Sequence, residues 1–279
     1  MSPLAGRHSI IDFNMRISLI TVCFNSVKTI RDTLESAFSQ KDVDLEYIIV
    51  DGGSTDGTVD LIREYDGRAK SGLTFRWVSE PDRGIYDAFN KGIKMATGDI
   101  VGILNADDVF ESDYTLSHIK AQFELRSTQD DEPLDAVYAD IRFVRQLGGR
   151  TVRYCSAKRF RPWMFRFAVM VPHPSFYLRR ELFEKYGAYC LEYKICADFE
   201  LVMRYMWKHR IKTRYMNECV VVMRTGGAST SGIKSNILIN KEDLKALKSN
   251  GYWSSLWLIY LKYFFKIWGF AYILKSILR

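Results

Sequence analysis

Two adjacent carboxylates, Asp107 and Asp108, come shortly after an apolar run at residues 100–104. The run predicts a strand that delivers both aspartates to the carboxyl edge of a sheet, where open α/β folds bind their ligands. Paired carboxylates at a strand end suit Mg²⁺ or Mn²⁺, which prefer hard oxygen ligands and can bridge a diphosphate. The alternative is a solvated turn in which one aspartate caps a helix, because Asp and Asn are common in turns.

Two further strand-like runs also end in polar residues. Asn25 follows the run at 16–23, and Asp51 follows the run at 47–50 together with a glycine pair that permits a tight turn. An aspartate in that place can accept hydrogen bonds from a nucleobase or a ribose. A plain strand-to-helix turn capped by Asp56 or Thr58 is the other interpretation. Three strands are therefore expected to send polar side chains to one edge of the sheet.

Strand-like and helix-like stretches alternate through the first half of the chain. The expected strands are 16–23, 47–50, 74–79 and 100–104, and the expected helices are 29–39, 57–65, 85–96 and 114–126. This order predicts an α/β fold with a doubly wound, mostly parallel sheet flanked by helices. The second half predicts a hairpin at 136–145 and 151–154, a helix at 198–208, a strand at 219–223 and a polar helix at 235–249.

The composition is that of a folded globular chain with a basic balance. Its 279 residues carry a formal net charge of +7, with 47% hydrophobic and 26% charged residues. A basic chain favours anionic partners, and without a repeated basic–aromatic pattern we expect a nucleotide or a membrane surface and no nucleic acid. The five cysteines form no CxxC pair and residues 1–14 contain no continuous apolar run. A reducing cytoplasm without a signal peptide is therefore the expected location.

Five motifs occur in one order along the chain: SLITVCFN at 18–25, YIIVDGGSTDGT at 47–58, EPDRGIYDAFNKG at 80–92, LNADD at 104–108 and LEYKICADFE at 191–200. Through these motifs the chain resembles the family 2 glycosyltransferases, which have the GT-A fold, a Rossmann-like nucleotide-diphospho-sugar transferase fold. The resemblance runs from residue 15 to residue 232. The chain is similar in particular to bacterial enzymes that build exopolysaccharide, colanic acid or O-antigen repeat units.

The resemblance implies a pocket for a nucleotide-sugar donor based on UDP, GDP or dTDP. Thr21 and Asn25 would line this pocket, and Asp51 would contact the nucleobase. Asp87 and Lys91 lie four residues apart on one helix face, so they could turn toward the ribose and the diphosphate. Their other interpretation is an exposed i,i+4 ion pair.

The resemblance also implies that Asp107 and Asp108 hold Mn²⁺ or Mg²⁺ on the donor diphosphate. Such a cation acts as a Lewis acid that neutralises charge on the departing nucleoside diphosphate. The family pattern is usually Asp-x-Asp or Asp-x-Asp-Asp, whereas Asn105 stands first here, which leaves open which aspartate binds metal directly. His173 fits a segment near the acceptor site of similar sequences and is a further candidate ligand, with a loop or core histidine as the alternative.

Asp198 matches the catalytic base of the family. The acidic pair there is commonly Glu-Asp, and this chain has Ala197 in place of the first acid. A lone carboxylate at a helix start can deprotonate an acceptor hydroxyl as that hydroxyl attacks the sugar carbon. One base and no second carboxylate assigned as nucleophile predict single displacement with inversion. The other interpretation is that Asp198 only caps the helix that follows.

The C-terminal segment at 252–278 is rich in aromatic residues, interrupted by Lys262, Lys266 and Lys275. Its apolar runs are too short to span a bilayer, and a wide apolar face beside basic residues suits a helix lying on an anionic membrane surface. The alternative is a helix packed on the core or in a homodimer. We therefore expect a cytoplasmic protein that is peripheral on the inner face of the plasma membrane. The resemblance implies that its acceptor is a polyprenyl-diphosphate-linked saccharide.

The expected organisation is an N-terminal tail at 1–14, a catalytic domain at 15–232 and a helical, membrane-associating region at 233–279. The catalytic domain would divide into a nucleotide-binding half at 15–110 and an acceptor half at 111–232. Two other functions compete with glycosyl transfer. A sugar nucleotidyltransferase would need a glycine-rich loop straight after the first strand, and residues 21–28 contain no glycine. A non-catalytic nucleotide-sugar-binding protein would have no need of the aspartates at 107, 108 and 198.

Overall fold

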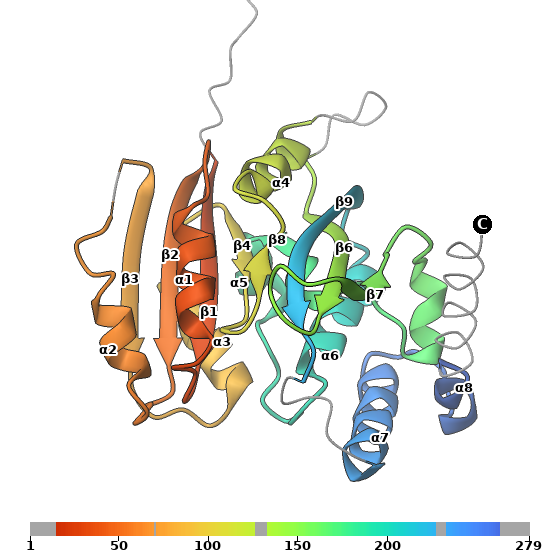
Figure 1. Ribbon diagram of the computed structural model, residues 1–279. Coiled ribbons are helices and arrows are strands. Elements are labelled where there is room, and N and C mark those ends of the chain that lie inside the picture. Colours follow the sequence, from red (N-terminus) through yellow and green to blue (C-terminus); the bar gives the residue numbers. More distant parts are fainter. Residues whose placement is uncertain (1–14, 70, 126–132, 227–232, 263–279) are drawn as a thin grey trace, which may run out of the picture.

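The computed structural model describes residues 15–69, 71–125, 133–226 and 233–262, and its first half is a parallel sheet with intervening helices (Figure 1). The strands are β1 (Arg16–Cys23), β2 (Asp44–Asp51), β3 (Leu73–Ser79) and β4 (Ile100–Ile103). The helices between them are α1 (Ile30–Phe38), α2 (Thr58–Arg63) and α3 (Ile85–Met95). The predicted alternation of strands and helices is confirmed. The expected tail at 1–14 lies outside the described residues.

The parallel strands bring their carboxyl ends to one edge of the sheet. β2 pairs in parallel with β1 and with β3, and β4 pairs in parallel with the other side of β1. Cys23 at the end of β1 lies opposite Asp51 at the end of β2. β1 and β2 are almost wholly buried, as strands are when helices cover both faces of a parallel sheet. The three polar turns predicted from the sequence therefore open on a common edge.

The second half of the chain extends the same sheet in a mixed arrangement. Its strands are β5 (Val109–Phe110), β6 (Ala136–Val144), β7 (Thr151–Cys155), β8 (Tyr177–Arg179) and β9 (Thr213–Arg224). The strand order is β3-β2-β1-β4-β8-β6-β9-β5, with β7 paired to β6. β8 is antiparallel to both β4 and β6, and β6 forms the predicted hairpin with β7.

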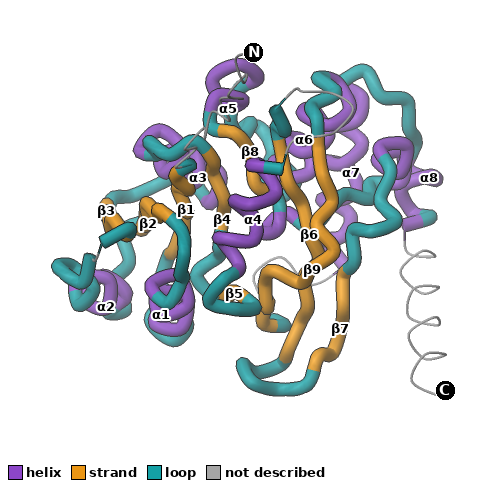
Figure 2. The backbone as a smooth tube through the Cα atoms, turned by 90° about the horizontal axis from the view of Figure 1, so that it is seen from above, coloured by secondary structure: helices purple, strands orange, loops and turns teal. Residues whose placement is uncertain are grey.

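Helices cover both faces of the sheet, as Figure 2 shows for α1 and α2 on one side of β1–β3 and α3 on the other. The remaining helical segments are α4 (Thr115–Glu124), η1 (Pro162–Phe167), η2 (His173–Ser175), α5 (Glu181–Tyr186), α6 (Ala197–Met203), η3 (Arg204–Lys208), α7 (Ile233–Ser249) and α8 (Leu256–Tyr260). α1, α2 and α4 bury their apolar side chains in one core, and α3, α5, α6, α7 and α8 bury theirs in the other. This two-sided packing is the doubly wound architecture that the sequence predicts.

Two elements differ from their predicted bounds because tertiary contacts decide them. β9 is much longer than the apolar run at 219–223, since its polar first half pairs in parallel with β6. The helix predicted at 198–208 ends at Met203 and continues as a single π-helical turn, η3. Neither feature has a periodicity in the sequence that would reveal it.

α7 and α8 pack into the core that also contains α3, α5 and α6. Ala246 and Ile259 are fully buried in the core that contains α6. Lys262 is buried as well, and its ammonium lies 2.8 Å from the Asp243 carboxylate of α7. The expectation that Lys262 faces a membrane is therefore wrong, because its ammonium group is buried in an ion pair with Asp243. Lys266 and Lys275 lie outside the described residues, and no helix within the described part of the chain is long and apolar enough to cross a membrane.

The contact between β4 and β8 leaves no room for a side chain at Gly102. A Cβ placed there would overlap the ring of Tyr177, which is buried on β8. We expect Gly102→Ala to lower the free energy of unfolding by about 1–3 kcal/mol, the usual cost of overpacking a core, as measured by urea denaturation. Tyr177→Phe is the control and should change it little, because the Tyr177 hydroxyl has no hydrogen-bond partner among the described residues. Equal stability of the two variants would contradict this packing.

Candidate functional site

A cleft of about 1080 Å³ opens at the carboxyl edge of β1 and β4. Its walls come from the turn after β1, the start of α3, the turn between β4 and β5, and the end of β9. Its polar lining residues are Asn25, Ser26, Lys28, Thr29, Asp56, Asp82, Asn105, Asp107, Arg153, Arg224 and Thr225. A parallel sheet places its ligand site at this edge, and the volume is slightly above the usual range of small-molecule pockets, about 300–1,000 Å³.

The turn after β2 is organised by Asp51 from inside the protein. The Asp51 carboxylate accepts hydrogen bonds from the backbone N–H groups of Gly53 (3.0 Å) and Ser54 (2.9 Å) and from the Ser79 hydroxyl (2.6 Å). Burial would raise the pKa of Asp51, but these hydrogen bonds outweigh it and lower the pKa. Asp51 is fully buried and outside the cleft lining, so in this structure it shapes the turn.

Of the residues predicted at the first strand, the structure brings Asn25 to the cleft and leaves Thr21 behind it. Thr21 is fully buried, and its hydroxyl donates to the Leu104 carbonyl oxygen at 2.7 Å. This bond ties the ends of β1 and β4 together. Asn25 lines the cleft with a left-handed backbone (φ 50°), and its side-chain oxygen accepts from the Thr55 N–H at 3.0 Å.

Asp87 and Lys91 pair with other residues of the segment around α3. Asp87 forms an ion pair with Arg83 at 2.8 Å, and that hydrogen-bonded charge lowers the pKa of Asp87. Lys91 forms an ion pair with Glu80 at 2.8 Å. Neither Asp87 nor Lys91 lines the large cleft, and Asp87 instead lines a second cavity of about 400 Å³ between α3 and α5.

Asp107 and Asp108 differ sharply in their surroundings. Asp107 lines the cleft, and burial raises its pKa. Asp108 is fully buried, and one of its oxygens accepts from the Asn105 side-chain amide at 2.8 Å. Its other oxygen, Oδ1, has no hydrogen-bond partner among the described residues. Burial, together with the charge of Asp107, raises the pKa of Asp108 to about 7.

Arg224 is a cleft residue that sequence reasoning missed. It ends β9, lines the cleft and forms an ion pair with Asp32 of α1. Its charge also acts on the nearby carboxylates and lowers the pKa of Asp107 against the effect of burial. The one sequence signal for it is its place at a strand end before a glycine pair. It supplies a fixed positive charge beside the two aspartates.

The residues present suit a divalent cation that shares its coordination with a substrate. Among the described residues, no group of three or more His, Cys, Asp or Glu is placed to hold a metal ion. A Mg²⁺ or Mn²⁺ ion commonly takes one or two protein carboxylates and completes its shell with phosphate oxygens and water. The unpartnered oxygen of Asp108 and the cleft-facing Asp107 fit such a site.

His173 does not join this pair, so its candidacy as a third metal ligand is not supported. Its Nε2 lies 2.6 Å from the Tyr189 hydroxyl, and its ring packs against Phe89. Burial lowers the pKa of His173 to about 4, so the ring is neutral at physiological pH. The alternative interpretation of a core histidine describes it better.

Asp198 lies at the start of α6 beside α3. Its Oδ1 accepts from the Phe199 N–H at 2.8 Å and lies 3.3 Å from the Tyr86 hydroxyl. Burial raises the pKa of Asp198 to about 6 in spite of these two hydrogen bonds. Asp198 does not itself line the cleft. Tyr86 belongs to the first turn of α3, and the neighbouring residues Gly84 and Ile85 do line it.

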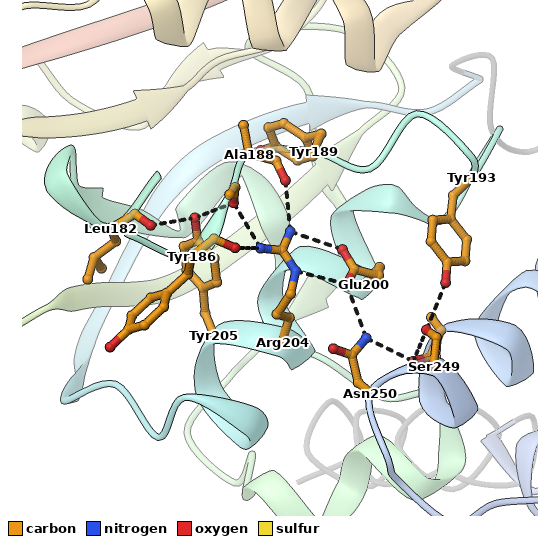
Figure 3. A network of polar contacts seen from close by, with 12 residues as sticks. Leu182, Tyr186, Ala188, Tyr189, Tyr193, Glu200, Arg204, Tyr205, Ser249 and Asn250 are labelled. Carbon is orange, nitrogen blue, oxygen red and sulfur yellow. Dashed lines mark hydrogen bonds and ion pairs between the residues drawn. The ribbon is translucent and has the colours of Figure 1, made fainter. Parts of the chain in front are cut away.

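An arginine cluster holds α6 against the segment that precedes it (Figure 3). Arg204 forms a buried ion pair with Glu200 at 2.9 Å and donates to the carbonyl oxygens of Gly187 (2.8 Å) and Ala188 (2.7 Å). The next residue, Tyr189, stacks on Tyr86 with 5.6 Å between the ring centroids. The Arg204 cluster therefore fixes the aromatic group that packs around Asp198.

Comparison with known proteins identifies the family. The chain matches the profile of glycosyl transferase family 2 over residues 18–187, more than half of its length. It belongs to this family. A PGL/p-HBAD biosynthesis glycosyltransferase of Mycobacterium bovis is 31% identical over 231 residues, which cover 82% of this chain and 83% of the relative. Asp198 lies beyond the matched segment, so the profile does not cover the proposed base.

Solved structures of other proteins have the same fold. TarS 1–349 of S. aureus, in complex with UDP-GlcNAc, superposes with a TM-score of 0.62 at 17% identity, covering 84% of this chain and 66% of the other. The mannosyltransferase PcManGT of Pyrobaculum calidifontis, in complex with GDP-Man and Mn²⁺, gives 0.61 at 19% identity, covering 85% and 64%. The chain thus spans less than two thirds of each of these structures. The GT-A fold expected from the sequence is confirmed.

The metal assignment predicts a stabilisation that depends on both aspartates. In thermal unfolding with UDP or GDP present, Mn²⁺ at about a hundred times its Kd should raise the free energy of unfolding by about 2.7 kcal/mol. Asp107→Asn and Asp108→Asn should each remove this increment, because each loses an anionic oxygen ligand. Asp60→Asn, on exposed α2, should keep it. An increment unchanged in both the Asp107 and the Asp108 variant would contradict the assignment.

Proposed function

We propose that the chain is an inverting glycosyltransferase that moves a sugar from a nucleotide-sugar donor to a hydroxyl of a lipid-linked saccharide acceptor. The family membership supports glycosyl transfer, and the cleft and its carboxylates support the finer roles. The observation that carries the proposal is a half-buried carboxylate, Asp198, with a raised pKa beside the helix that forms one cleft wall. Such a group is suited to take a proton near neutral pH.

The cleft has the features that a nucleoside diphosphate sugar requires. Lys28, Arg153 and Arg224 line it and supply positive charge for a diphosphate. Phe24 lines it too with 63% of its surface exposed, which offers an aromatic face on which a base can stack. Structures of the same fold with UDP-GlcNAc and with GDP-Man support a donor of this class.

Asp107 and Asp108 would hold the divalent cation, Mn²⁺ or Mg²⁺, in this proposal. The bound cation supplies Lewis acidity that stabilises the negative charge of the leaving nucleoside diphosphate. Arg224 adds a fixed positive charge on the same side of the cleft, where it would share with the cation the neutralisation of the diphosphate.

Asp198 would accept the proton of the acceptor hydroxyl while that oxygen attacks the anomeric carbon of the donor sugar. The bond from that carbon to the diphosphate oxygen breaks as the new glycosidic bond forms, so the configuration inverts. Tyr86 orients the carboxylate through its hydroxyl at 3.3 Å. No second carboxylate is assigned as a nucleophile, and a single displacement follows.

A donor panel tests the proposed function directly. The protein is titrated with UDP-glucose, UDP-GlcNAc, GDP-mannose and dTDP-glucose, each with and without Mn²⁺, in a thermal-shift assay. One nucleotide class should stabilise the protein, and slow release of its nucleoside diphosphate should follow by hydrolysis. A sugar nucleotidyltransferase would instead release pyrophosphate from a nucleoside triphosphate and a sugar 1-phosphate. Binding without any turnover would favour a non-catalytic nucleotide-sugar-binding protein.

The base assignment predicts a rate effect and a pH profile. Asp198→Asn should bind the donor like the wild type and lose on the order of 10²–10⁴ in kcat. In the wild type, activity should fall about tenfold per pH unit below about pH 6, because the base is protonated there, and should level off above it. Turnover is measured as released nucleoside diphosphate. A normal rate in Asp198→Asn would assign the base elsewhere.

We also propose that the protein works as a peripheral protein on the anionic inner surface of the cytoplasmic membrane. A tryptophan-rich face supports this: Trp257 is 85% exposed, Trp253 is 71% exposed and Trp163 of η1 is 56% exposed. The Arg166 guanidinium lies 5.7 Å from the centre of the Trp253 ring, and other exposed basic residues precede it at 158–161. Aromatic and basic side chains together suit an anionic lipid interface.

Substitution on the tryptophan-rich face tests this proposal without truncation, which would leave Asp243 buried without its Lys262 partner. The double variant Trp253→Ser, Trp257→Ser should lower binding to vesicles with anionic lipid at least tenfold, because each ring contributes about 1.5–3 kcal/mol on burial. Tyr114→Ser, which changes an exposed aromatic residue just before α4, is the control. Binding is measured by vesicle sedimentation. No vesicle binding by the wild type, with a dimer that the double variant dissociates, would instead assign the face to a homodimer.

A further inference from the structure

A carboxylate of α7, Glu242, holds the backbone that leads into the proposed base. Its two oxygens accept hydrogen bonds from the N–H groups of Lys194 (3.0 Å), Ile195 (2.9 Å) and Cys196 (3.1 Å). The Glu242 side chain is nearly fully buried. These N–H groups come immediately before α6, where the backbone donors lack partners within the helix. Glu242, from a helix far away in the sequence, therefore provides the hydrogen-bond acceptor for three consecutive backbone N–H groups shortly before Asp198.

The segment that Glu242 holds is the one that directs the Asp198 side chain. The Tyr86 hydroxyl is within hydrogen-bond distance of the Ile195 carbonyl oxygen and of Asp198 Oδ1. If the backbone at 194–196 moved, the Ile195 carbonyl would release Tyr86 and the carboxylate would lose its orientation. Small displacements of a reacting group, on the order of 1 Å, can cost about a hundredfold in rate.

The far end of α7 anchors the same helix a second time. Asn250 donates to Glu200 of α6 at 3.1 Å, and Glu200 is the partner of Arg204 in the cluster of Figure 3. Ser249 lies 3.0 Å from the Tyr193 hydroxyl, just before the segment bound by Glu242. α7 thus holds α6 at two places, and Glu242 is the one next to the base.

We propose that Glu242 is a positioning residue for glycosyl transfer, which orients Asp198 by fixing the backbone of residues 194–196. The inference rests on the proposed function in which Asp198 is the base. It places a residue outside the catalytic domain expected from the sequence in control of that base. Glu242 itself touches neither donor nor acceptor in this role, and acts through the backbone and through its charge.

The charge of Glu242 gives this role a signature that a purely structural tie would lack. The titratable groups around Asp198 are Tyr86 of α3, Tyr189 and Cys196 of the segment before α6, and Glu242 and Asp243 of α7. Asp243 is paired with Lys262. Burial is the main cause of the raised pKa of Asp198, and the negative charge of Glu242 raises that pKa further. Removing that charge should therefore shift the acidic limb of the pH profile to lower pH.

The test compares Glu242→Gln with the wild type, using nucleoside diphosphate release from the donor that the panel selects. The variant keeps the side-chain volume and one acceptor oxygen. We expect kcat to fall about tenfold to a hundredfold, the acidic limb to move to lower pH, and the donor Kd to stay unchanged. Glu192→Gln is the control, because Glu192 lies in the same segment but is exposed and paired with Lys245. It should change none of the three quantities.

A double-mutant cycle separates this inference from the proposed function. If Glu242 acts through Asp198, Glu242→Gln should cost nothing further in an Asp198→Asn background. Additive losses, or an unchanged kcat and pH limb in the single variant, would overturn the positioning role while leaving the base assignment intact. Normal turnover by Asp198→Asn would overturn both. Should Glu242→Gln unfold at the assay temperature, Glu242→Asp keeps the charge and loses reach, so kcat should fall without a shift of the limb.

Discussion

The parallel pairing of β1 with β2 and β4 is the constraint on which the site depends. It aligns Cys23 with Asp51 and Ile20 with Ile103, so that the turn after each strand opens on one edge. A polar bond inside the sheet fixes this register, since the buried Thr21 hydroxyl donates to the carbonyl of Leu104. A slip of one residue would turn every side chain of the strand to the opposite face, and the cleft would lose its lining.

The alternation of strands and helices and the cleft edge could be predicted from the sequence, but the direction of individual side chains could not. Apolar runs ending in polar turns are sufficient to place Asn25 and Asp107 at a common edge, and both line the cleft. Thr21 and Asp51 come from the same motifs and are buried behind it. Their direction depends on partners, Leu104 and Ser79, that lie far away in the sequence and carry no periodic signal.

The residues whose roles the sequence did not reveal are those whose partners lie far away in the sequence and come close only through tertiary packing. Arg224 reaches Asp32 of α1, Lys262 reaches Asp243, and Glu242 reaches the backbone before α6. Composition suggested that the C-terminal lysines would stay in solvent, because Lys is rarely buried without a partner. The partner exists in α7, and the ion pair joins the C-terminal segment to the core. A charge pattern alone cannot distinguish a buried pair from a membrane contact.

Burial has a different consequence at each of the two carboxylate sites, Asp108 and Asp198. At Asp108 it leaves an oxygen without a protein partner and makes the ionised group costly, which is offset when a cation binds. At Asp198 burial raises the pKa, while hydrogen bonds from Phe199 and Tyr86 keep the carboxylate oriented. The group is therefore still ionised at neutral pH and can accept a proton. The first site needs positive charge, and Arg224 supplies part of it. The second needs negative surroundings and a fixed backbone, and Glu242 supplies both. Burial thus raises the pKa of both aspartates, and the charged group that lies beside each one suits it to a different task.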